Sequence, residues 1–377
     1  MLIENAVVFT QGKLTRDVRV RTQAGRVTAL GDLAPDPGER IVDAQGLYLL
    51  PGFVDIHIHG FGGQDTMQGE AAVRHMADGL AAQGVAGFLP TTMSASPADT
   101  RAALAGIAAV MAAPQPGGAR VLGAHMEAPF LCPRHAGAQV PAYFEQPSLA
   151  AYEAMTRGAE AVPRLITLAP ELPGSEELVR ALAARGVRVA AGHSDATAEH
   201  LHAAADWGLT QVTHLFNAQS PLHHRMPGVP GAALTDARVG VQVIADLIHL
   251  HPDTVRLAIA AKRCAACGYG VLLITDAMMA AGMPDGDYSL GGQRVTVRAG
   301  AARLQDGTLA GSTLLMHQAL TNVIRLGTPP EEAIPMVTEA PARSIGAQDV
   351  VGRIAPGCDA MFALMDGDWR FTNALVG

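Results

Sequence analysis

The sequence predicts a (β/α)8 barrel with a small β-sandwich built from both ends of the chain. Three observations lead to this fold class. Residues 1–50 hold short β-like runs separated by turn residues, strand and helix patterns alternate from residue 51 onward, and β-like runs return after residue 352. We therefore expect two domains, a β-sandwich of residues 1–50 and 352–377 and a barrel of residues 51–351.

The small β unit is expected first along the chain, because its apolar and β-branched runs end at Gly, Asp or Pro turn residues. Its expected strands are 6–10, 18–22, 26–30 and 40–43. Near the carboxyl terminus, Pro356 and Gly357 mark a turn. The runs 360–364 and 369–373 are expected to return to the same unit.

The barrel is expected because eight strand-like runs occupy about the length that this fold needs. The runs are 53–59, 87–92, 120–126, 164–170, 187–193, 211–216, 240–249 and 270–276. Helical patterns mark residues 71–83, 97–112, 175–185, 198–207, 253–267, 313–326 and 331–344. A doubly wound open sheet is the alternative, but it offers one crevice, whereas the candidate site residues end strands along the whole run.

Composition predicts a compact protein with neither a nucleic-acid nor a membrane partner. Of 377 residues, 49% are hydrophobic and 16% charged, and the net charge is −8. No apolar run reaches the roughly 18 residues of a membrane span, and the amino terminus lacks a signal-peptide pattern. Four cysteines in so long a chain indicate a reducing cytoplasm. The pair Cys264 and Cys267 has no second CxxC beside it, so it indicates neither a zinc nor a redox site.

Two histidines end the first expected barrel strand, within the stretch PGFVDIHIHG at residues 51–60. Side chains on a strand repeat every two residues, so His57 and His59 point to the same side. Such a pair suits a divalent metal, but HxH alone fits two hydrogen-bonded histidines equally well. Further ligands decide between the two.

Four more candidate ligands follow other barrel strands. They are Glu127 after the third strand, His193 on the fifth, His214 on the sixth and Asp276 on the eighth. Each alone could be a core histidine or a helix-capping carboxylate. Six nitrogen and oxygen donors at one end of a barrel predict a site for zinc, iron or cobalt.

The six donors can hold one or two metals. His57, His59 and Asp276 would form one half and His193 and His214 the other, with Glu127 shared. A bound divalent metal activates water and polarises a carbonyl. Asp276 is the candidate general base and acid, moving a proton from water to a leaving nitrogen. This chemistry is consistent with hydrolysis of a C–N bond, although the ligands alone do not single out that bond.

Six segments carry a resemblance to a known family: PGFVDIHIHG, GAHMEAPF, GHSDAT, THLFNAQSPLHHRMPG, ADLIH and ITDAMMAAG. In order and over nearly the whole chain, they resemble the N-acetylglucosamine-6-phosphate deacetylases, a branch of the amidohydrolase superfamily. HxH is moderately specific, whereas HLFNA…HHR…PG and ITDA are highly specific. The resemblance implies a metal-dependent hydrolysis of N-acetylglucosamine 6-phosphate to glucosamine 6-phosphate and acetate.

The resemblance also implies roles for single residues. Glu127, His193 and His214 match the family's metal ligands, Asp276 its catalytic aspartate, and His57 and His59 an extra pair that only some members have. One or two divalent ions are implied, foremost zinc or iron, with manganese or cobalt as alternatives. The matching substrate contacts are Ala138, Asn217, Ala218, Arg225, His249, Leu309, Ala310 and Gly311.

The resemblance assigns Arg225 to the 6-phosphate, in the family often across a homodimer. The residue types are consistent with this assignment. His223, His224 and Arg225 form a potentially cationic cluster, and a guanidinium can bind phosphate through two hydrogen bonds. Alone, such a cluster is more often a solvated surface. No GxxxxGK loop is present, so the phosphate is a handle for binding and is not transferred.

Three residues depart from the family pattern. Ala128 and Leu247 stand where the family usually has Gly, and Met226 replaces a common acidic residue. We expect all three to adjoin the sugar pocket, which leaves N-acetylgalactosamine 6-phosphate or a broad substrate range open.

Two other functions are weighed against this one. Cyclic-amide hydrolases of the superfamily generally bridge two metals with a carboxylated lysine, but the two lysines, Lys13 and Lys262, end no expected barrel strand. A deaminase is a further possibility within the superfamily. A catalytically silent barrel that binds sugar phosphates is the alternative from another class. Such relatives typically lose ligands, whereas this sequence keeps them all.

Overall fold

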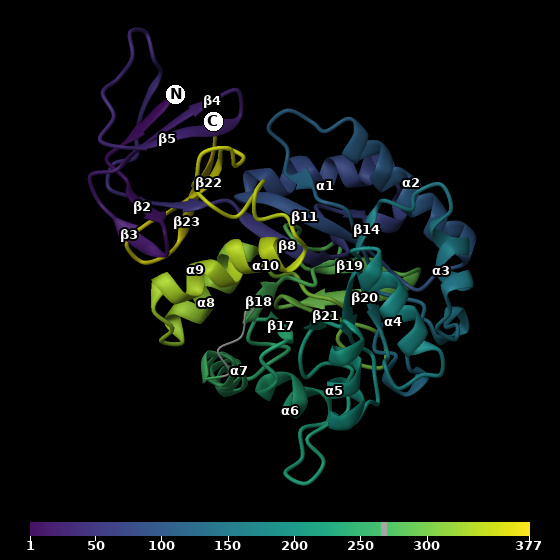
Figure 1. Cartoon of the computed structure of the whole chain (residues 1–377). Helices are drawn as coiled ribbons and strands as arrows, with labels where there is room; N and C mark the ends of the chain where they lie inside the picture. Colours follow the sequence, from purple (N-terminus) through teal and green to yellow (C-terminus); the bar gives the residue numbers. More distant parts are fainter. Residues whose placement is uncertain (265–269) are drawn as a thin grey trace.

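The computed structural model describes residues 1–264 and 270–377. Its centre is a nearly closed barrel of eight parallel strands surrounded by helices, and smaller sheets lie outside it (Figure 1). The predicted fold class is confirmed. In the part of the chain described, no helix is both long and apolar enough to cross a membrane.

The third barrel strand is made of two pieces, β12 and β13, which both pair with β11 on either side of a break at Gly123. Parallel pairing runs from β8 through β11 to β18, and a bridge between Ile58 and Ala277 brings the end of β18 beside β8. The strands are β8 (Phe53–Ile58), β11 (Val85–Thr92), β12 (Arg120–Val121), β13 (Ala124–Met126), β14 (Pro163–Leu168), β15 (Arg188–Ala191), β16 (Gln211–Val212), β17 (Gly240–Ile244) and β18 (Val271–Ile274).

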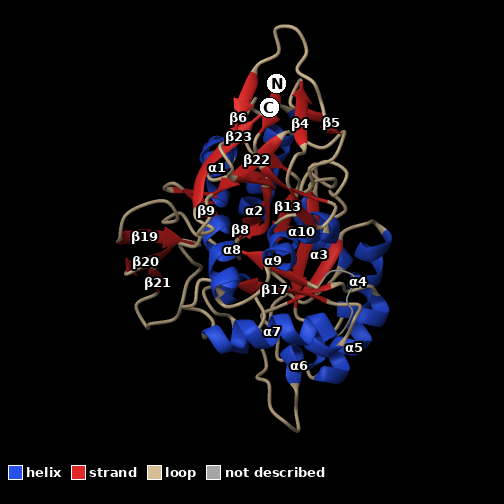
Figure 2. Ribbon diagram, turned by 90° about the vertical axis from the view of Figure 1, so that its left-hand side faces the viewer, coloured by secondary structure: helices blue, strands red, loops and turns tan. Residues whose placement is uncertain are grey.

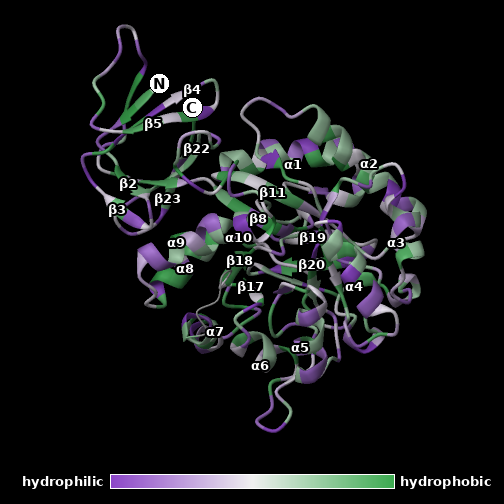
Figure 3. Ribbon diagram, viewed as in Figure 1, coloured by the Kyte–Doolittle hydropathy of each residue, from purple (hydrophilic) through white to green (hydrophobic). Residues whose placement is uncertain are grey.

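The helices pack an apolar stripe against the barrel, where hydrophobic residues concentrate (Figure 3). In α8 the buried residues Met316, Ala319, Leu320 and Val323 recur at helical spacing. The helices are α1 (Glu70–Ala82), α2 (Pro97–Ala112), α3 (Leu149–Thr156), α4 (Ser175–Ala184), α5 (Ala198–Trp207), α6 (Gly228–Thr235), α7 (Pro252–Cys264), α8 (Met316–Arg325), α9 (Pro330–Val337) and α10 (Glu339–Ser344), with the 3-10 turns η1 (Thr66–Gln68), η2 (Pro133–His135) and η3 (Pro141–Tyr143).

One helix prediction differs from the structure, and another can be compared only in part. The single helix expected at 331–344 is α9 and α10, which meet at Thr338 with φ −133° and ψ −91°. Pro341 explains the break, because it has no N–H to continue the hydrogen bonds of α9. The helix expected at 253–267 is described as far as Cys264, so Cys267 of the CxxC lies outside the described residues.

The two ends of the chain come together in the small sheets beside the barrel (Figure 1). One sheet has the order β23-β22-β7-β2-β3 and the other β5-β4-β1-β6. The division into domains at residues 50 and 352 stays a prediction. The strands are β1 (Leu2–Glu4), β2 (Val7–Thr10), β3 (Lys13–Thr15), β4 (Arg19–Gln23), β5 (Arg26–Gly31), β6 (Ile41–Asp43), β7 (Tyr48–Pro51), β22 (Met361–Met365) and β23 (Phe371–Val376).

A three-stranded antiparallel sheet at one end of the barrel was not predicted (Figure 2). It consists of β19 (Gly286–Leu290), β20 (Gln293–Arg298) and β21 (Ala301–Arg303), and a separate hairpin pairs β9 (Gly60–Phe61) with β10 (Gln64–Asp65). Gly291 and Gly292 join β19 to β20 with φ of +56° and +78°, a turn signal visible in the sequence. The Gln293 amide donates to the Ala138 carbonyl (2.7 Å), which ties this sheet to the loop after β13.

His317 on α8 should make stability depend on pH. Its ring stacks on Phe371 of β23 at 4.8 Å, and burial lowers its pKa to about 4. The unfolded chain therefore binds more protons than the folded one between about pH 4 and 6.5, so the free energy of unfolding should fall by up to about 3 kcal/mol as pH drops through this window.

Chemical denaturation of His317→Phe, which keeps the ring stack, should show a smaller loss of stability in acid. His251→Gln, at an exposed histidine, should match the wild type; equal acid loss in all three proteins would contradict the assignment.

Candidate metal centre

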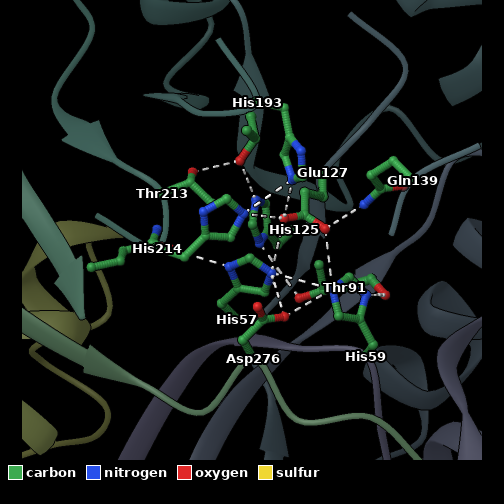
Figure 4. Close-up of polar contacts among 12 residues, drawn as sticks. His57, His59, Thr91, His125, Glu127, Gln139, His193, Thr213, His214 and Asp276 are labelled. Atoms are coloured by element: carbon green, nitrogen blue, oxygen red, sulfur yellow. Dashed lines mark hydrogen bonds and ion pairs between the residues drawn. The ribbon is translucent and has the colours of Figure 1, made fainter. Parts of the chain in front are cut away.

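The six predicted ligands meet at the carboxyl end of the barrel (Figure 4). His57 lies on β8, His59 follows it, and Glu127 follows β13. His193, His214 and Asp276 each lie two residues past the end of β15, β16 and β18, with φ of +47°, +28° and +50°. Non-glycine residues rarely adopt such angles, and where they do they often lie in functional sites. The chain therefore turns sharply after three strands to aim these side chains inward.

Each half of the ligand set forms a small triangle of donor atoms. His57 Nε2, His59 Nε2 and Asp276 Oδ1 are 3.3 Å apart along all three sides. In the other triangle, Glu127 Oε1 lies 3.2 Å from His193 Nε2 and 3.0 Å from His214 Nε2, and these two nitrogens are 3.0 Å apart.

Glu127 links the two triangles. Its Oε1 also lies 3.3 Å from His57 Nε2, and its Oε2 lies 3.1 Å from His59 Nε2. One carboxylate therefore reaches imidazoles of both halves, as a ligand shared between two metals would.

Hydrogen bonds on the far side of the imidazoles show which nitrogen carries the proton. His59 Nδ1 lies 3.2 Å from the Thr91 carbonyl and His193 Nδ1 lies 2.8 Å from the His135 carbonyl. A carbonyl only accepts, so each Nδ1 donates, and in the neutral imidazole the lone pair is then on Nε2, facing the centre. The buried His214 Nδ1 has no hydrogen-bond partner among the residues that the structure describes.

These triangles fit a divalent metal. Ligands held about 2.0–2.1 Å from a tetrahedral zinc ion are separated by about 3.3–3.4 Å, close to the sides of both triangles. Imidazole lone pairs that face one another at such distances repel unless a cation or a proton lies between them. Nitrogen and carboxylate donors backed by fixed hydrogen-bond partners are also the usual surroundings of zinc or iron.

The charges in the centre favour a cation. Burial raises the pKa of Glu127, but His57, His193 and His214 outweigh burial and hold this pKa well below its ordinary value. Burial lowers the pKa of His59, but Asp276 and Glu127 outweigh it and raise this pKa well above its ordinary value. Burial also raises the pKa of Asp276, but His57 and His59 outweigh it and lower this pKa. Both carboxylates are therefore ionised near neutral pH, and protons compete with a metal for the imidazoles.

Sequence reasoning missed a glutamine that touches the shared carboxylate. Gln139 is buried, and its Nε2 donates to Glu127 Oε2 (2.5 Å) while its Oε1 accepts from the Ser94 amide (2.7 Å). The contact fixes the rotation of the carboxylate. Gln139 lies in a loop and ends no strand, so no pattern in the sequence marks it.

A cavity of about 400 Å³ opens above the metal ligands. Asp276 has the largest exposed fraction of the six ligands, at 8%, and lines this cavity, whereas His57 is fully buried beneath it. Six of the predicted substrate residues line the cavity: Ala138, Asn217, Ala218, His249, Leu309 and Gly311. Met93, Arg134, His135, Leu290 and Thr308 line it too and were not predicted.

Two predicted substrate residues lie away from the cavity of the single chain. Ala310 is buried among the methionines beneath β19–β21, and Arg225 lies on an exposed hairpin, where its Nη1 is 2.8 Å from His224 Nε2. His249, by contrast, is held at the cavity by Asp246, whose Oδ2 lies 2.7 Å from its Nδ1.

None of Ala128, Leu247 and Met226 lines the cavity of the single chain, and the expectation that they adjoin the sugar pocket stays a prediction. Leu247 has φ +64°, the conformation that explains why glycine suits this position, whereas Ala128 avoids the left-handed region. Met226 lies on the hairpin of Arg225 and is 70% exposed. The sequence alone could not show that this hairpin projects away from the cavity of its own chain.

The chain matches known proteins along most of its length. A family model described as "Amidohydrolase family" matches residues 48–377. An N-acetylgalactosamine-6-phosphate deacetylase of Escherichia coli is 38% identical over 93% of this chain and 91% of its own length. An N-acetylglucosamine-6-phosphate deacetylase of Bacillus subtilis is 35% identical over 98% of this chain and 93% of its own length.

Solved structures agree with these relatives. An N-acetylglucosamine-6-phosphate deacetylase from Pasteurella multocida superposes with a TM-score of 0.91 at 26% identity, covering 100% of this chain and 97% of that one. A mutant of the Mycobacterium smegmatis enzyme, in complex with N-acetyl-D-glucosamine-6-phosphate, gives 0.90 at 31% identity, with the same two coverages. The family model spans far more than half of the residues. The chain belongs to the amidohydrolase family.

Proposed function

We propose that this protein hydrolyses the acetamide of N-acetylglucosamine 6-phosphate to glucosamine 6-phosphate and acetate. The observation that carries the proposal is the pair of ligand triangles, joined by Glu127, at the floor of a cavity of about 400 Å³. The names of the relatives support the substrate, since most of those compared are N-acetylglucosamine-6-phosphate deacetylases.

One or two divalent metals are proposed as the cofactor, with zinc or iron foremost and manganese or cobalt as alternatives. His193, His214 and Glu127 would hold one ion, and His57, His59 and Asp276 the other. When bound, such an ion supplies Lewis-acid polarisation of the acetamide carbonyl and activation of water.

Asp276 is proposed to move the proton. Its carboxylate lines the cavity, and His57 and His59 outweigh the effect of burial and keep its pKa below the ordinary value, so it can accept a proton from the attacking water. It can then return that proton to the amine that leaves. His249, fixed by Asp246 at 2.7 Å, is proposed to face the acetamide and the sugar hydroxyls. It would donate to the carbonyl oxygen as negative charge develops there.

N-acetylgalactosamine 6-phosphate is the second candidate substrate. The specific observation in its favour is the 38% identity with a deacetylase of that name. The two sugars differ only in the orientation of one hydroxyl, so residues of the cavity wall would decide between them.

A homodimer is proposed because Arg225 does not reach the cavity of its own chain. The hairpin that carries it also exposes Leu222 and Met226, at 46% and 70%, which suits burial against a second copy. In such a dimer the guanidinium would bind the 6-phosphate of the partner's substrate.

Arg225→Ala should raise the KM for the 6-phosphorylated substrate by roughly 10-fold or more, because a bidentate charge-assisted contact is lost. Mixing Arg225→Ala chains with Asp276→Asn chains tests whether the residue acts across a dimer. If Arg225 serves the neighbour, the hybrid regains activity, since one of its sites has Asp276 and receives Arg225. No gain on mixing would place Arg225 in its own site or outside any site.

The other candidate functions have less support. Lys262 lies on α7, where its Nζ donates to the carbonyls of Ala233, Asp236 and Val239, and Lys13 lies on β3, so neither can bridge metals as a carboxylated lysine. A catalytically silent barrel would not need two complete ligand triangles. A cytoplasmic location is proposed from the cysteines, since Cys132, Cys264 and Cys358 are free thiols.

Acetate release from a panel of N-acetylated sugars tests the proposed function. N-acetylglucosamine 6-phosphate should be the preferred substrate, with its galactosamine epimer next and the unphosphorylated sugar far behind. Hydantoin and dihydroorotate, run beside it, test the cyclic-amide alternative. Turnover of a cyclic amide without acetate release from any sugar would contradict the proposal.

A further inference from the structure

Two fully buried amides lie inside the barrel below the metal centre. Gln211 is on β16 and Gln242 on β17, and both have no exposed surface. On β17, Gln242 is the one polar residue in the run from Val241 to Ala245. Buried amides are costly unless all their groups are hydrogen-bonded, so two of them together in a barrel core call for a role.

The amides form a continuous chain of hydrogen bonds from α10 to the metal centre. Gln211 Nε2 donates to the backbone carbonyl of Ser344 (3.5 Å), Gln242 Nε2 donates to Gln211 Oε1 (3.1 Å), and Gln242 Oε1 lies 3.2 Å from His57 Nδ1.

The backbone carbonyl of Ser344 sets the donor and acceptor direction of the other hydrogen bonds in this series. The Ser344 carbonyl can only accept, so the Gln211 nitrogen must face it and the Gln211 oxygen must face Gln242. Gln242 therefore turns its nitrogen to Gln211 and its oxygen to His57. An amide oxygen can only accept, so His57 must carry its proton on Nδ1 and keep a lone pair on Nε2.

We propose that Gln211 and Gln242 are positioning residues that fix the tautomer of His57 from the opposite end of the barrel. His59 and His193 obtain the same tautomer directly from backbone carbonyls, at Thr91 and His135. His57 lies deeper and reaches a backbone carbonyl only through the two amides. The inference rests on the proposed function only in that His57 is a metal ligand there.

Gln211 does not touch His57, so a substitution of Gln211 can affect His57 only through Gln242. Replacing Gln211 by Leu leaves the Gln242 nitrogen without an acceptor, so the amide can turn and offer an N–H to His57 Nδ1. Nε2 would then carry the proton, which has to leave Nε2 before a metal can bind there, so the affinity would fall. Gln242→Leu removes the acceptor itself, whereas Gln242→Glu keeps an acceptor facing Nδ1.

The first experiment measures the tautomer in metal-free protein by nitrogen NMR on ¹⁵N-histidine-labelled chains, with the His57 signal assigned from His57→Asn. The wild type and Gln242→Glu should show the Nδ1–H form. Gln211→Leu and Gln242→Leu should shift toward the Nε2–H form. If Gln242→Leu fails to fold, Gln211→Leu, which keeps Gln242, gives the same test.

The second experiment measures zinc affinity by competition with a chelator. Both Leu variants should weaken the site of His57, His59 and Asp276 by about 10- to 100-fold and leave the site of His193 and His214 within about threefold of wild type. An Nδ1–H tautomer and unchanged affinity in Gln211→Leu would overturn the relay. Neither the tautomer nor the zinc affinity is measured with a sugar substrate. Both results therefore hold even if the protein does not catalyse the proposed reaction, which acetate release tests separately.

Discussion

Asp276→Asn is expected to lower kcat by about 10²- to 10⁴-fold while leaving substrate binding almost unchanged. Asparagine has the same shape and keeps an oxygen that can face the metal, but it cannot take a proton from water. Asp276 is the most exposed of the six ligands and lines the cavity, so the lost proton transfer would act directly on the bound substrate. Steady-state acetate release gives kcat, and calorimetry gives the affinity for substrate.

Asp287→Asn is the matched control for this variant. Asp287 is an exposed carboxylate on β19 that pairs with Arg294 and lies outside the cavity. It should behave as wild type in both measurements. Metal analysis of Asp276→Asn should still find the ion held by Glu127, His193 and His214. Wild-type kcat in Asp276→Asn would remove this residue from the proposed reaction.

Glu127→Gln should cause the broadest loss, because this carboxylate belongs to both halves of the site. Its Oε1 lies within 3.3 Å of His57, His193 and His214, and its Oε2 lies 3.1 Å from His59. A neutral amide cannot balance two divalent cations, so the metal content should fall well below that of wild type. The Lewis acidity lost with the metal is worth several kcal/mol, or about 10²- to 10⁴-fold in turnover.

Elemental analysis of the purified variant measures this effect, and excess zinc in the assay separates weak binding from lost chemistry. Partial recovery at high zinc would show that the main defect is affinity. Asp276→Asn, which affects one triangle only, should retain more metal than Glu127→Gln. An equal metal content in wild type and Glu127→Gln would contradict the assignment of a shared carboxylate.

The fold and the meeting of the six proposed metal ligands could be predicted because both follow from local patterns. A parallel barrel brings the ends of all its strands to one face, so His57 on β8 and Asp276 after β18 must meet although 219 positions separate them. To predict that these side chains meet, it is enough to locate the end of each strand to within a residue or two. The structure then adds the sharp turns at His193, His214 and Asp276, which aim these side chains.

The surroundings of the ligands could not be predicted, since they depend on contacts between distant loops and strands. Gln139 reaches Glu127 from a loop, and β19–β21 add Leu290 to the cavity wall. Gln242 left a weak signal as a polar residue in an apolar strand, but its partner Gln211 is identified only once β16 and β17 are seen side by side. The proposed role of Arg225 depends on a second copy of the chain, and no pattern within one sequence shows how two copies would pack.

The measurement that tests the central claim most directly is anomalous X-ray scattering from crystals of the active protein at the absorption edge of its metal. We predict a peak inside the triangle of Glu127, His193 and His214, and a second peak inside that of His57, His59 and Asp276 when metal is in excess. An active protein whose crystals show no anomalous peak at either triangle would contradict the account.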